Sequence, residues 1–391
     1  MTLGGNDRNG WKADIDLARR WSIISMMKRA NSSKRPHLVR RAIIAAAFVA
    51  ASVQACSNSI STSEDAEQAA MQPVVRAVFA HDRLWLLRFD GSLVSLDPRG
   101  AKPKAVASTR KIVDICKSDK SLTAVMDDSR GAWTLQQYSP DGWIVGAKLP
   151  TSGDILVAVD CGDGGDITLV TNRHLLEVRG GTVRALRLKQ KIQPPLVNGT
   201  ALATEDAVWV GFNIGEWGGG LRRIDRSDGQ VATIERNRSG ELCSGPLNTS
   251  CDPVNGVAVS PWKPSCVVAA VGLVHMIAHG RIVEVCGKEV RRLYYKPLDP
   301  QPPHDALDDG EPSSTVAFFG LAHGDDALWA IGIDGIYRFG GPQSPEFRPL
   351  PKFQDKGGYR ISFDIPGIAL VMTDVNQQAS LSGAVPIMAV R

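Results

Sequence analysis

The chain has 391 residues, of which 43% are apolar and 22% charged, a balance typical of a folded globular protein. Residues 1–55 hold ten of the 45 Lys and Arg and three of the 41 Asp and Glu, so the formal charge of +4 comes from the N-terminal part. The remainder has 35 basic and 38 acidic side chains, close to −3, which excludes the basic surface that nucleic-acid binding requires.

A secretory signal is predicted near the N-terminus. Arg40 and Arg41 precede an apolar run at 42–53, which is too short to span a membrane. The sequence Val53-Gln54-Ala55-Cys56 resembles the bacterial lipobox, with Gln54 in place of the usual small residue. This resemblance implies lipidation of Cys56 and a periplasmic lipoprotein, which we expect on the outer membrane. The alternative is an ordinary signal peptide and a soluble periplasmic or secreted protein.

The signal divides the chain into four predicted parts. A start at Met26 or Met27 would give a basic region of ordinary length, so we predict that residues 1–25 are a misassigned upstream extension and that 26–55 are the signal peptide. Residues 56–73 are rich in Ser, Thr, Ala and acids without apolar periodicity, which predicts a flexible tether. Residues 74–391 form the predicted folded domain.

Short apolar runs joined by an Asp-Gly pair mark this domain. Residues 83–96 read RLWLLRFDGSLVSL and residues 325–339 read DDALWAIGIDGIYRF, each with a Trp five residues before the Asp. An Asp-Gly pair between apolar runs predicts a hairpin with a type I′ turn, in which both central residues have positive φ. We therefore predict such turns at Asp90-Gly91 and Asp334-Gly335.

The other apolar runs follow at spacings of about 38 to 61 residues, close to the length of a propeller blade. A third copy at 205–225 keeps the Trp, here Trp209, and has a longer Gly-rich turn. A polar insertion at 236–253 and a Pro- and Asp-rich loop at 297–312 separate the later runs. Further hairpin turns are predicted at Asp141-Gly142, Gly180-Gly181, Asp228-Gly229 and His279-Gly280.

One strand–turn–strand unit repeated along a chain indicates a repeat architecture. We predict an all-β fold, a β-propeller of four-stranded blades at residues 74–391, with seven blades and with six or eight as the alternatives. A pair of β-sandwiches or a β-helix is the competing architecture; the hairpin in each unit and the unit length favour the propeller, because radial repetition leaves only short edges.

Three of the units, at 84–97, 208–225 and 328–339, resemble the blades of a known propeller type. The blade pattern of that type is Trp-x-Gly-x-x-x-Gly-Leu-x-Arg, then an apolar residue and Asp. Trp209, Gly211, Gly219 or Gly220, Leu221, Arg223 and Asp225 match it, and Trp329, Gly332, Gly335, Ile336, Arg338 and Phe339 match in part. The chain thereby resembles the two-component-regulator type of β-propeller, a family of extracytoplasmic sensor modules. The resemblance implies a sensor-like propeller without an attached output domain, and it assigns no catalytic residue.

Seven cysteines leave six for pairing if Cys56 carries the lipid, and an exported chain can oxidise them. Cys243 and Cys251 would close a short loop, Cys266 and Cys286 flank a predicted hairpin, and Cys116 and Cys161 occupy similar places in consecutive units. Zinc is the alternative, but the spacing of a Cys/His ligand set is absent from the sequence. We therefore predict disulfides and no metal.

The Gly-rich turn at 212–220 is the candidate ligand site. Asn213, Glu216 and Trp217 would place an amide, an acid and an aromatic ring together, a combination suited to a sugar or a small polar ligand. Trp262 and Lys263, between two prolines, form a second candidate. The alternative for both tryptophans is packing against a neighbouring blade.

Two possible metal sites are unfavourable. His275 and His279 would lie about 13 Å apart along a strand, too far for one ion. An acidic loop could bind Ca²⁺, but it lacks a calcium-loop pattern, and we expect a solvated loop. Its acids are Asp305, Asp308, Asp309 and Glu311.

The sequence leaves three functions open. The first is a non-enzymatic binding or scaffold module of the cell envelope, monomeric, without a cofactor, that holds an envelope protein or a glycan on one propeller face. The second is an exported propeller enzyme, a lyase or hydrolase acting on an envelope or glycan substrate. The third is a scaffold role like that of the outer-membrane assembly propellers. The candidate residues of the enzyme hypothesis are His81, His174, His323 and Glu216.

Overall fold

A computed structural model of the chain describes residues 74–97, 104–128, 131–151, 153–194, 199–237, 245–275, 277–299, 312, 314–324, 327–342, 344–350, 359–364, 367–373 and 387–390. All of these residues belong to one compact unit, Ser61–Arg391. The predicted upstream extension, signal peptide and tether, with Cys56, lie outside the described residues. In the described part, no helix has the length and apolar character needed to cross a membrane.

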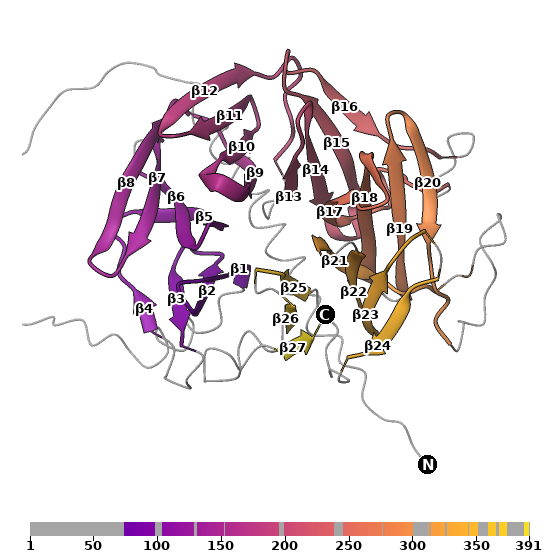
Figure 1. Cartoon of the computed structure of the whole chain (residues 1–391). Helices are drawn as coiled ribbons and strands as arrows, with labels where there is room; N and C mark the ends of the chain where they lie inside the picture. The colour runs from indigo at the N-terminus through magenta and orange to yellow at the C-terminus, as the bar shows by residue number, and fades with distance from the viewer. Residues whose placement is uncertain are drawn as a thin grey trace, which may run out of the picture. The chain divides into compact units, whose positions relative to one another are not determined.

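The described chain is all-β, as predicted, apart from two short 3₁₀ helices. Its sheets are antiparallel meanders in which consecutive strands are neighbours (Figure 1). The first sheet has the order β1 (Val74–Ala80), β2 (Arg83–Arg88), β3 (Leu93–Leu96) and β4 (Lys104–Val106). The second has the order β5 (Lys111–Ser118), β6 (Ser121–Asp127), β7 (Trp133–Ser139) and β8 (Gly142–Leu149).

An eight-stranded sheet follows, and it consists of two such meanders. A short parallel pairing of β9 with β13, at Gly199 with Ala158 and Thr200 with Val159, joins the two halves. One half contains β9 (Leu156–Cys161), β10 (Ile167–Thr171), β11 (His174–Arg179) and β12 (Thr182–Arg187), with helix η1 (Asp163–Gly165). The other contains β13 (Gly199–Ala203), β14 (Ala207–Asn213), β15 (Gly219–Asp225) and β16 (Val231–Ile234), with helix η2 (Gly215–Trp217).

Three further sheets complete the described chain. The first contains β17 (Val254–Ser260), β18 (Lys263–His275), β19 (Ile277–Cys286) and β20 (Glu289–Tyr294). The next contains β21 (Phe318–Gly324), β22 (Ala327–Gly332), β23 (Gly335–Phe339) and β24 (Glu346–Pro349). The last has three strands, β25 (Tyr359–Ser362), β26 (Ile368–Thr373) and β27 (Ile387–Val390).

The first strands of the meanders form a closed cycle of contacts. β1 contacts β5, β5 contacts β9, β9 contacts β13, β13 contacts β17, β17 contacts β21, β21 contacts β25, and β25 contacts β1. A cycle of inner strands, each followed outward by the other strands of its meander, is the arrangement of a β-propeller. The predicted propeller of four-stranded units is therefore the architecture of the described chain.

The core lies between neighbouring meanders. One cluster packs Trp85 and Val78 of the first sheet against Leu122 and Met126 of the second, and equivalent clusters fill the later junctions. The repeated Trp of the sequence is part of this core, since Trp85, Trp209 and Trp329 are each at most 6% exposed. The repeated Trp of the sequence therefore has a structural role in the core.

Polar contacts of the inner strands hold the cycle together. Asp364, after β25, accepts a hydrogen bond from the backbone N–H of Phe79 in β1 at 2.8 Å, and its carbonyl accepts one from Lys117 Nζ at 2.5 Å. Arg76 of β1 forms a bidentate pair with the buried Asp114 of β5, at 3.0 and 2.9 Å, and reaches the carbonyl of Gly199 at 3.4 Å. These contacts join different sheets, and those made by Asp364 and Gly199 bridge segments that are more than 120 residues apart in sequence.

The predicted turn at Asp90-Gly91 lies between β2 and β3, but it is not type I′, because only Gly91 has a positive φ. Two other predicted turns are misplaced, and glycine packing explains both. Gly335 begins β23 without a positive φ, and the loop is Ile333-Asp334. A Cβ on Gly335 would lie 2.4 Å from the carbonyl of Arg348, so this glycine allows β24 to approach. Gly280 lies inside β19, where a Cβ would lie 2.5 Å from the carbonyl of Val316. By contrast, Gly180 and Gly181 both have positive φ, as a type I′ turn requires.

The cysteine prediction is confirmed where it can be followed. Cys116 of β5 is bonded to Cys161 of β9, and Cys266 of β18 to Cys286 of β19. Cys251 is also disulfide-bonded, and its predicted partner, Cys243, lies outside the described residues. Every cysteine in the described ranges is therefore oxidised, as expected of a chain that folds in an oxidising compartment.

Candidate functional site

The candidate loop between β14 and β15 is a short arm with a defined backbone. The side-chain oxygen of Asn213 accepts a hydrogen bond from Gly215 N at 2.8 Å, which starts the single turn of η2. Gly218 then has φ 76° and Gly219 φ 134°, values that disfavour any other residue. Ile214 N also donates to the carbonyl of Gly218 at 2.8 Å. The sequence thus specifies this arm.

The hairpin β18–β19 stands beside this arm and is longer than its neighbours. β18 pairs with β17 only up to Val271, while the β18–β19 pairing continues to His275 and Ile277. Its tip contacts η2, and His275 Nε2 lies 2.9 Å from Glu216 Oε2. The arm and the hairpin tip therefore form one continuous structure.

Asn255 of β17 connects the arm to the neighbouring strands. The side-chain amide of Asn213 donates to the Asn255 side-chain oxygen at 2.6 Å. The Asn255 amide in turn donates to the carbonyls of Gly272 and Phe318, at 2.8 and 2.9 Å. The polar groups of Asn213 and Glu216, which the sequence offered for a polar ligand, are thus engaged within the chain.

The arm rests on residues 248–252, inside the polar insertion. Gly219 N donates to Thr249 O at 2.9 Å and Gly220 N to Asp252 O at 2.8 Å. The packing is tight, because a Cβ on Gly218 would lie 2.3 Å from Thr249 O. Cys251, in a disulfide, belongs to the same segment. The position of the arm therefore depends on a covalently anchored segment.

A buried ion pair fixes this segment to β19. The Asp252 side chain has no exposure and the Arg281 side chain is 3% exposed, with Nη2 2.5 Å from Asp252 Oδ2. Asn248 N donates to the same oxygen at 2.6 Å, and His279 Nε2 lies 3.2 Å from Oδ1. Arg281 also donates to the carbonyls of Pro246 and Gly245. Removing any of these partners would leave the buried Asp252 carboxylate poorly compensated, so the network fixes the position of residues 248–252.

Three apolar side chains on the arm and on the tip of the β18–β19 hairpin are exposed to solvent. Trp217 is 73% exposed, Ile214 43% and Ile277 43%. Ile277 pairs with His275, the partner of Glu216, so it lies on the hairpin tip next to the arm. We refer to Ile214, Trp217 and Ile277 as the Trp217 surface. The arm exposes a Trp and an Ile, and the hairpin that contacts the arm exposes a second Ile at its tip. Exposed side chains of this kind are typical of a protein-binding surface.

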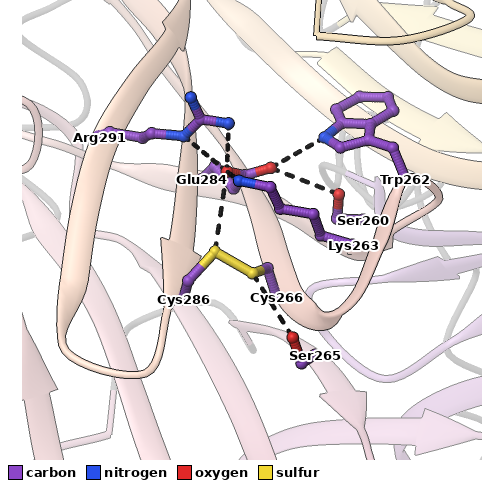
Figure 2. The surroundings of a disulfide bond; sticks show 8 residues. All are labelled: Ser260, Trp262, Lys263, Ser265, Cys266, Glu284, Cys286 and Arg291. Carbon is purple, nitrogen blue, oxygen red and sulfur yellow. Dashed lines mark hydrogen bonds and ion pairs between the residues drawn. A yellow bond between two sulfur atoms is a disulfide. The ribbon is translucent and has the colours of Figure 1, made fainter.

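The second predicted ligand pair, Trp262 and Lys263, serves a buried carboxylate instead. Glu284 of β19 has a fully buried side chain and accepts hydrogen bonds from Trp262 Nε1 at 2.9 Å and Arg291 Nε at 2.6 Å. Lys263 Nζ lies 3.4 Å away, and the disulfide Cys266–Cys286 is adjacent (Figure 2). Burial raises the pKa of Glu284, but the hydrogen bonds from Trp262 and Arg291 outweigh it and lower the pKa overall. This favours the packing alternative for Trp262.

The four residues of the enzyme hypothesis do not converge. Consecutive strands of a meander run in opposite directions. The loop between its second and third strands therefore lies at one end of the sheet, and the loop between its first and second strands lies at the other end. His174 begins β11 and Glu216 lies between β14 and β15, both at the former end. His81 lies between β1 and β2, and His323 lies near the end of β21, which puts both at the opposite end.

His174 has a structural partner that the sequence did not reveal. Its Nδ1 lies 2.7 Å from Oδ2 of Asp154, whose side chain is 1% exposed, and Thr171 Oγ1 donates to the same oxygen at 2.7 Å. Thr171 Oγ1 also accepts from His174 N at 2.7 Å. This network closes the turn between β10 and β11.

A charged cleft of about 620 Å³ lies between β11–β12 and β15. Glu177 is its most buried acid, and it accepts hydrogen bonds from Arg184 Nη1 and Arg226 Nε, both at 2.6 Å. Burial raises the pKa of Glu177, but these hydrogen bonds outweigh it and hold the pKa below its usual value. Arg223 similarly pairs with Asp206 at 2.7 Å. The cleft thus contains charges that already neutralise one another.

The metal predictions can be followed only in part. The acidic loop with Asp305, Asp308, Asp309 and Glu311 lies outside the described residues. His275 and His279 pair with Glu216 and Asp252, respectively. Across the described ranges, no group of three or more His, Cys, Asp or Glu has the geometry to hold a metal ion.

No family model matches the chain, and no curated protein matches it. Among solved structures, the chain is similar to virginiamycin B lyase from Staphylococcus aureus, at 14% identity and a TM-score of 0.48, over 78% of this chain and 92% of that one. It is also similar to the extracellular domain of a putative one-component system from B. thetaiotaomicron, at 14% identity and 0.45, over 78% of this chain and 37% of that one.

A third similar structure is BamB from Moraxella catarrhalis, at 10% identity and a TM-score of 0.40, over 81% of this chain and 83% of that one. Likenesses at this level carry no conclusion about what the chain binds or does. Membership in the two-component-regulator type of propeller stays a prediction.

Proposed function

We propose that the chain is an exported, seven-bladed β-propeller that acts as a non-enzymatic binding module of the bacterial cell envelope. A partner protein docks on the Trp217 surface. The seven inner strands of the contact cycle support the blade count, with the eight-stranded sheet counted as two blades and the three-stranded sheet as the last. The disulfides support export, because such bonds persist in oxidising compartments.

The exposure of Trp217 is the observation that carries this proposal. A Trp that is 73% exposed on an arm anchored by an ion pair, hydrogen bonds and a disulfide-bearing segment gains nothing for folding. Rigidity lowers the entropic cost of binding, so such an arm is suited to docking. The exposed Ile214 and Ile277 extend the apolar area.

A protein fits this surface better than the glycan that the sequence left open. Sugar recognition needs hydrogen-bonding groups beside the aromatic ring, and here the Asn213 amide and the Glu216 carboxylate are already engaged with Asn255 and His275. The groups that remain are apolar, and they would bury apolar side chains of a partner. Lipidation of Cys56 would hold the module at the membrane, and a monomer is sufficient for the proposed binding.

The test uses the full-length oxidised protein, purified from its own envelope, as bait for cross-linking to envelope proteins. We expect one or few partner proteins whose cross-linking is lost in Trp217→Ala and kept in Ile144→Ala, a variant of an exposed apolar residue on the outer strand β8. Capture of glycan alone, or turnover of an envelope substrate at an enzyme-like rate, would overturn the proposal.

A further inference from the structure

The charged cleft between β11–β12 and β15 is separate from the Trp217 surface. Asp206 precedes β14 and Asp225 ends β15, whereas Trp217 lies in the loop that joins these two strands. Because β14 and β15 are antiparallel, these two cleft residues and the arm lie at opposite ends of the hairpin. The cleft volume of about 620 Å³ is within the range of small-molecule sites. The proposed protein docking therefore leaves this cleft open for a second ligand.

The part of the cleft around Glu177 has a surplus of positive charge. The buried Glu177 carboxylate accepts hydrogen bonds from two guanidinium groups, those of Arg184 and Arg226. One carboxylate and two guanidinium groups leave a net charge of +1. The side chain of Arg184 is 54% exposed, and Arg179, which lines the same cleft from the end of β11, is 63% exposed. Both of these arginines can therefore reach a ligand.

The part of the cleft around Arg223 has a surplus of negative charge. The Arg223 guanidinium pairs with the carboxylates of Asp206 at 2.7 Å and Asp225 at 3.4 Å, so this group has a net charge of −1. Glu205, next to Asp206 in the chain, also lines the cleft and adds to this surplus. The hydrogen bond from Arg223 lowers the pKa of Asp206, so this carboxylate is ionised at neutral pH. With a side chain that is 73% exposed, Asp206 can reach a ligand.

We propose that this cleft binds a small zwitterion, a short peptide or an amino acid with free termini. The carboxylate of the ligand pairs with Arg184 and Arg179, and its ammonium group pairs with Asp206. The cleft is lined by four Arg and by four Asp or Glu, so its charges cancel in sum, and a ligand of a single charge sign gains nothing from the whole cleft. The two charge surpluses are separated, and a molecule that has both charges matches both of them.

The first test is calorimetric titration of the full-length oxidised protein with alanine, dialanine and trialanine at low ionic strength, where exposed charges are screened least. We expect saturable binding, with a Kd on the order of 0.1 mM for the best of the three. Tighter binding of the peptides would identify the ligand as a peptide, and equal binding of alanine would identify it as an amino acid; both outcomes support the proposal. Absence of saturable binding of all three up to about 10 mM would overturn it.

Blocked forms of the best ligand test the two ends of the cleft separately. N-acetylation removes the ammonium group and C-amidation removes the carboxylate, and each should weaken binding at least about tenfold. Binding of the blocked forms as tight as that of the free zwitterion would overturn the proposal, because the charges of the ligand would then not be recognised.

Variants assign each end to a residue. In Asp206→Asn, N-acetylation of the ligand should weaken binding less than about twofold, and in Arg184→Gln the same should hold for C-amidation. Lys189→Gln, which breaks an exposed pair with Asp228 outside the cleft lining, is the control and should respond to both modifications as wild type does. A variant that only damages the fold would weaken binding of the free and the blocked ligands alike, and that result in both variants would overturn the assignment. Docking of the partner protein on the Trp217 surface should be unchanged in Asp206→Asn, so the failure of one proposal is distinguishable from the failure of the other.

Discussion

Replacement of Trp217 by Ala should remove most of the binding to the proposed partner protein while leaving the fold intact. A buried Trp side chain contributes on the order of 200 Å². With 73% exposed, about 150 Å² is available, which at about 25 cal/mol per Å² sets an upper limit near 4 kcal/mol. Because Ala keeps part of the contact and association has its own cost, we expect a loss of about 2 kcal/mol, or roughly 30-fold in Kd.

The assay is titration of the captured partner with wild-type protein, Trp217→Ala and the matched variant Ile144→Ala. Ile144 is 59% exposed on β8, at the outer edge of a different sheet. It therefore controls for a general loss of exposed apolar area. Unfolding temperatures should agree within about 1 °C for all three proteins, because neither side chain is part of the core.

A Kd within about twofold of wild type for Trp217→Ala would refute the assignment of this surface. Equal losses in Trp217→Ala and Ile144→Ala would also refute it, since binding would then respond to apolar area in general. A loss confined to Trp217→Ala, with unchanged stability, is the expected result.

Three further predictions concern stability and processing. Arg281→Met leaves the Asp252 charge buried without its ion-pair partner and should lower the free energy of unfolding in denaturant by about 3–5 kcal/mol. The control, Arg338→Met, breaks an exposed pair with Glu346 and should lower it by less than about 1 kcal/mol. Similar losses in the two variants would contradict the role of burial. The lowered pKa of Glu177 contributes stability that is fully present above the unfolded pKa of about 4.3 and is lost as the pH falls through the folded pKa. Glu177→Gln should therefore weaken the decrease of the free energy of unfolding at acidic pH. An unchanged decrease would count against the hydrogen bonds to Glu177. The intact mass of protein from native membranes should show a diacyl or triacyl group on Cys56 and a gain of about 6 Da on reduction; an unlipidated mass with free thiols would contradict the proposed location.

The fold was readable from the sequence because its signals are local. Alternating apolar runs and Gly-Gly or Asp-Gly pairs depend on neighbouring residues, and Gly180-Gly181 behaves as its turn chemistry predicts. Gly335 and Gly280 are not turn glycines; they allow a close approach of the neighbouring strand β24 and of Val316, respectively. A glycine between apolar residues therefore marks either a turn or a close contact, and only the three-dimensional arrangement distinguishes them.

The sequence predicts only part of the candidate site, the arm with Trp217, and not the contacts that support it. The Gly-rich interruption at 212–220 marked the arm and Trp217, because a regular hairpin needs no such insertion. The support of the arm could not be predicted, since it comes from 248–252 and from the long β18–β19 hairpin. That hairpin turns between His275 and Ile277, where the sequence offers no Gly, Asn or Pro to reveal it. The Asp252–Arg281 pair likewise joins residues that no local pattern connects.

The contact between Asp364 and Phe79 has a consequence for how the chain acquires its structure. These residues are 285 positions apart, so the hydrogen bond that joins β1 to the last sheet forms only after nearly the whole domain is available. Contacts of such high sequence separation slow folding. While the chain is being synthesised, the early sheets would form with one flank of β1 uncovered. That flank stays accessible to folding helpers until Asp364 is in place.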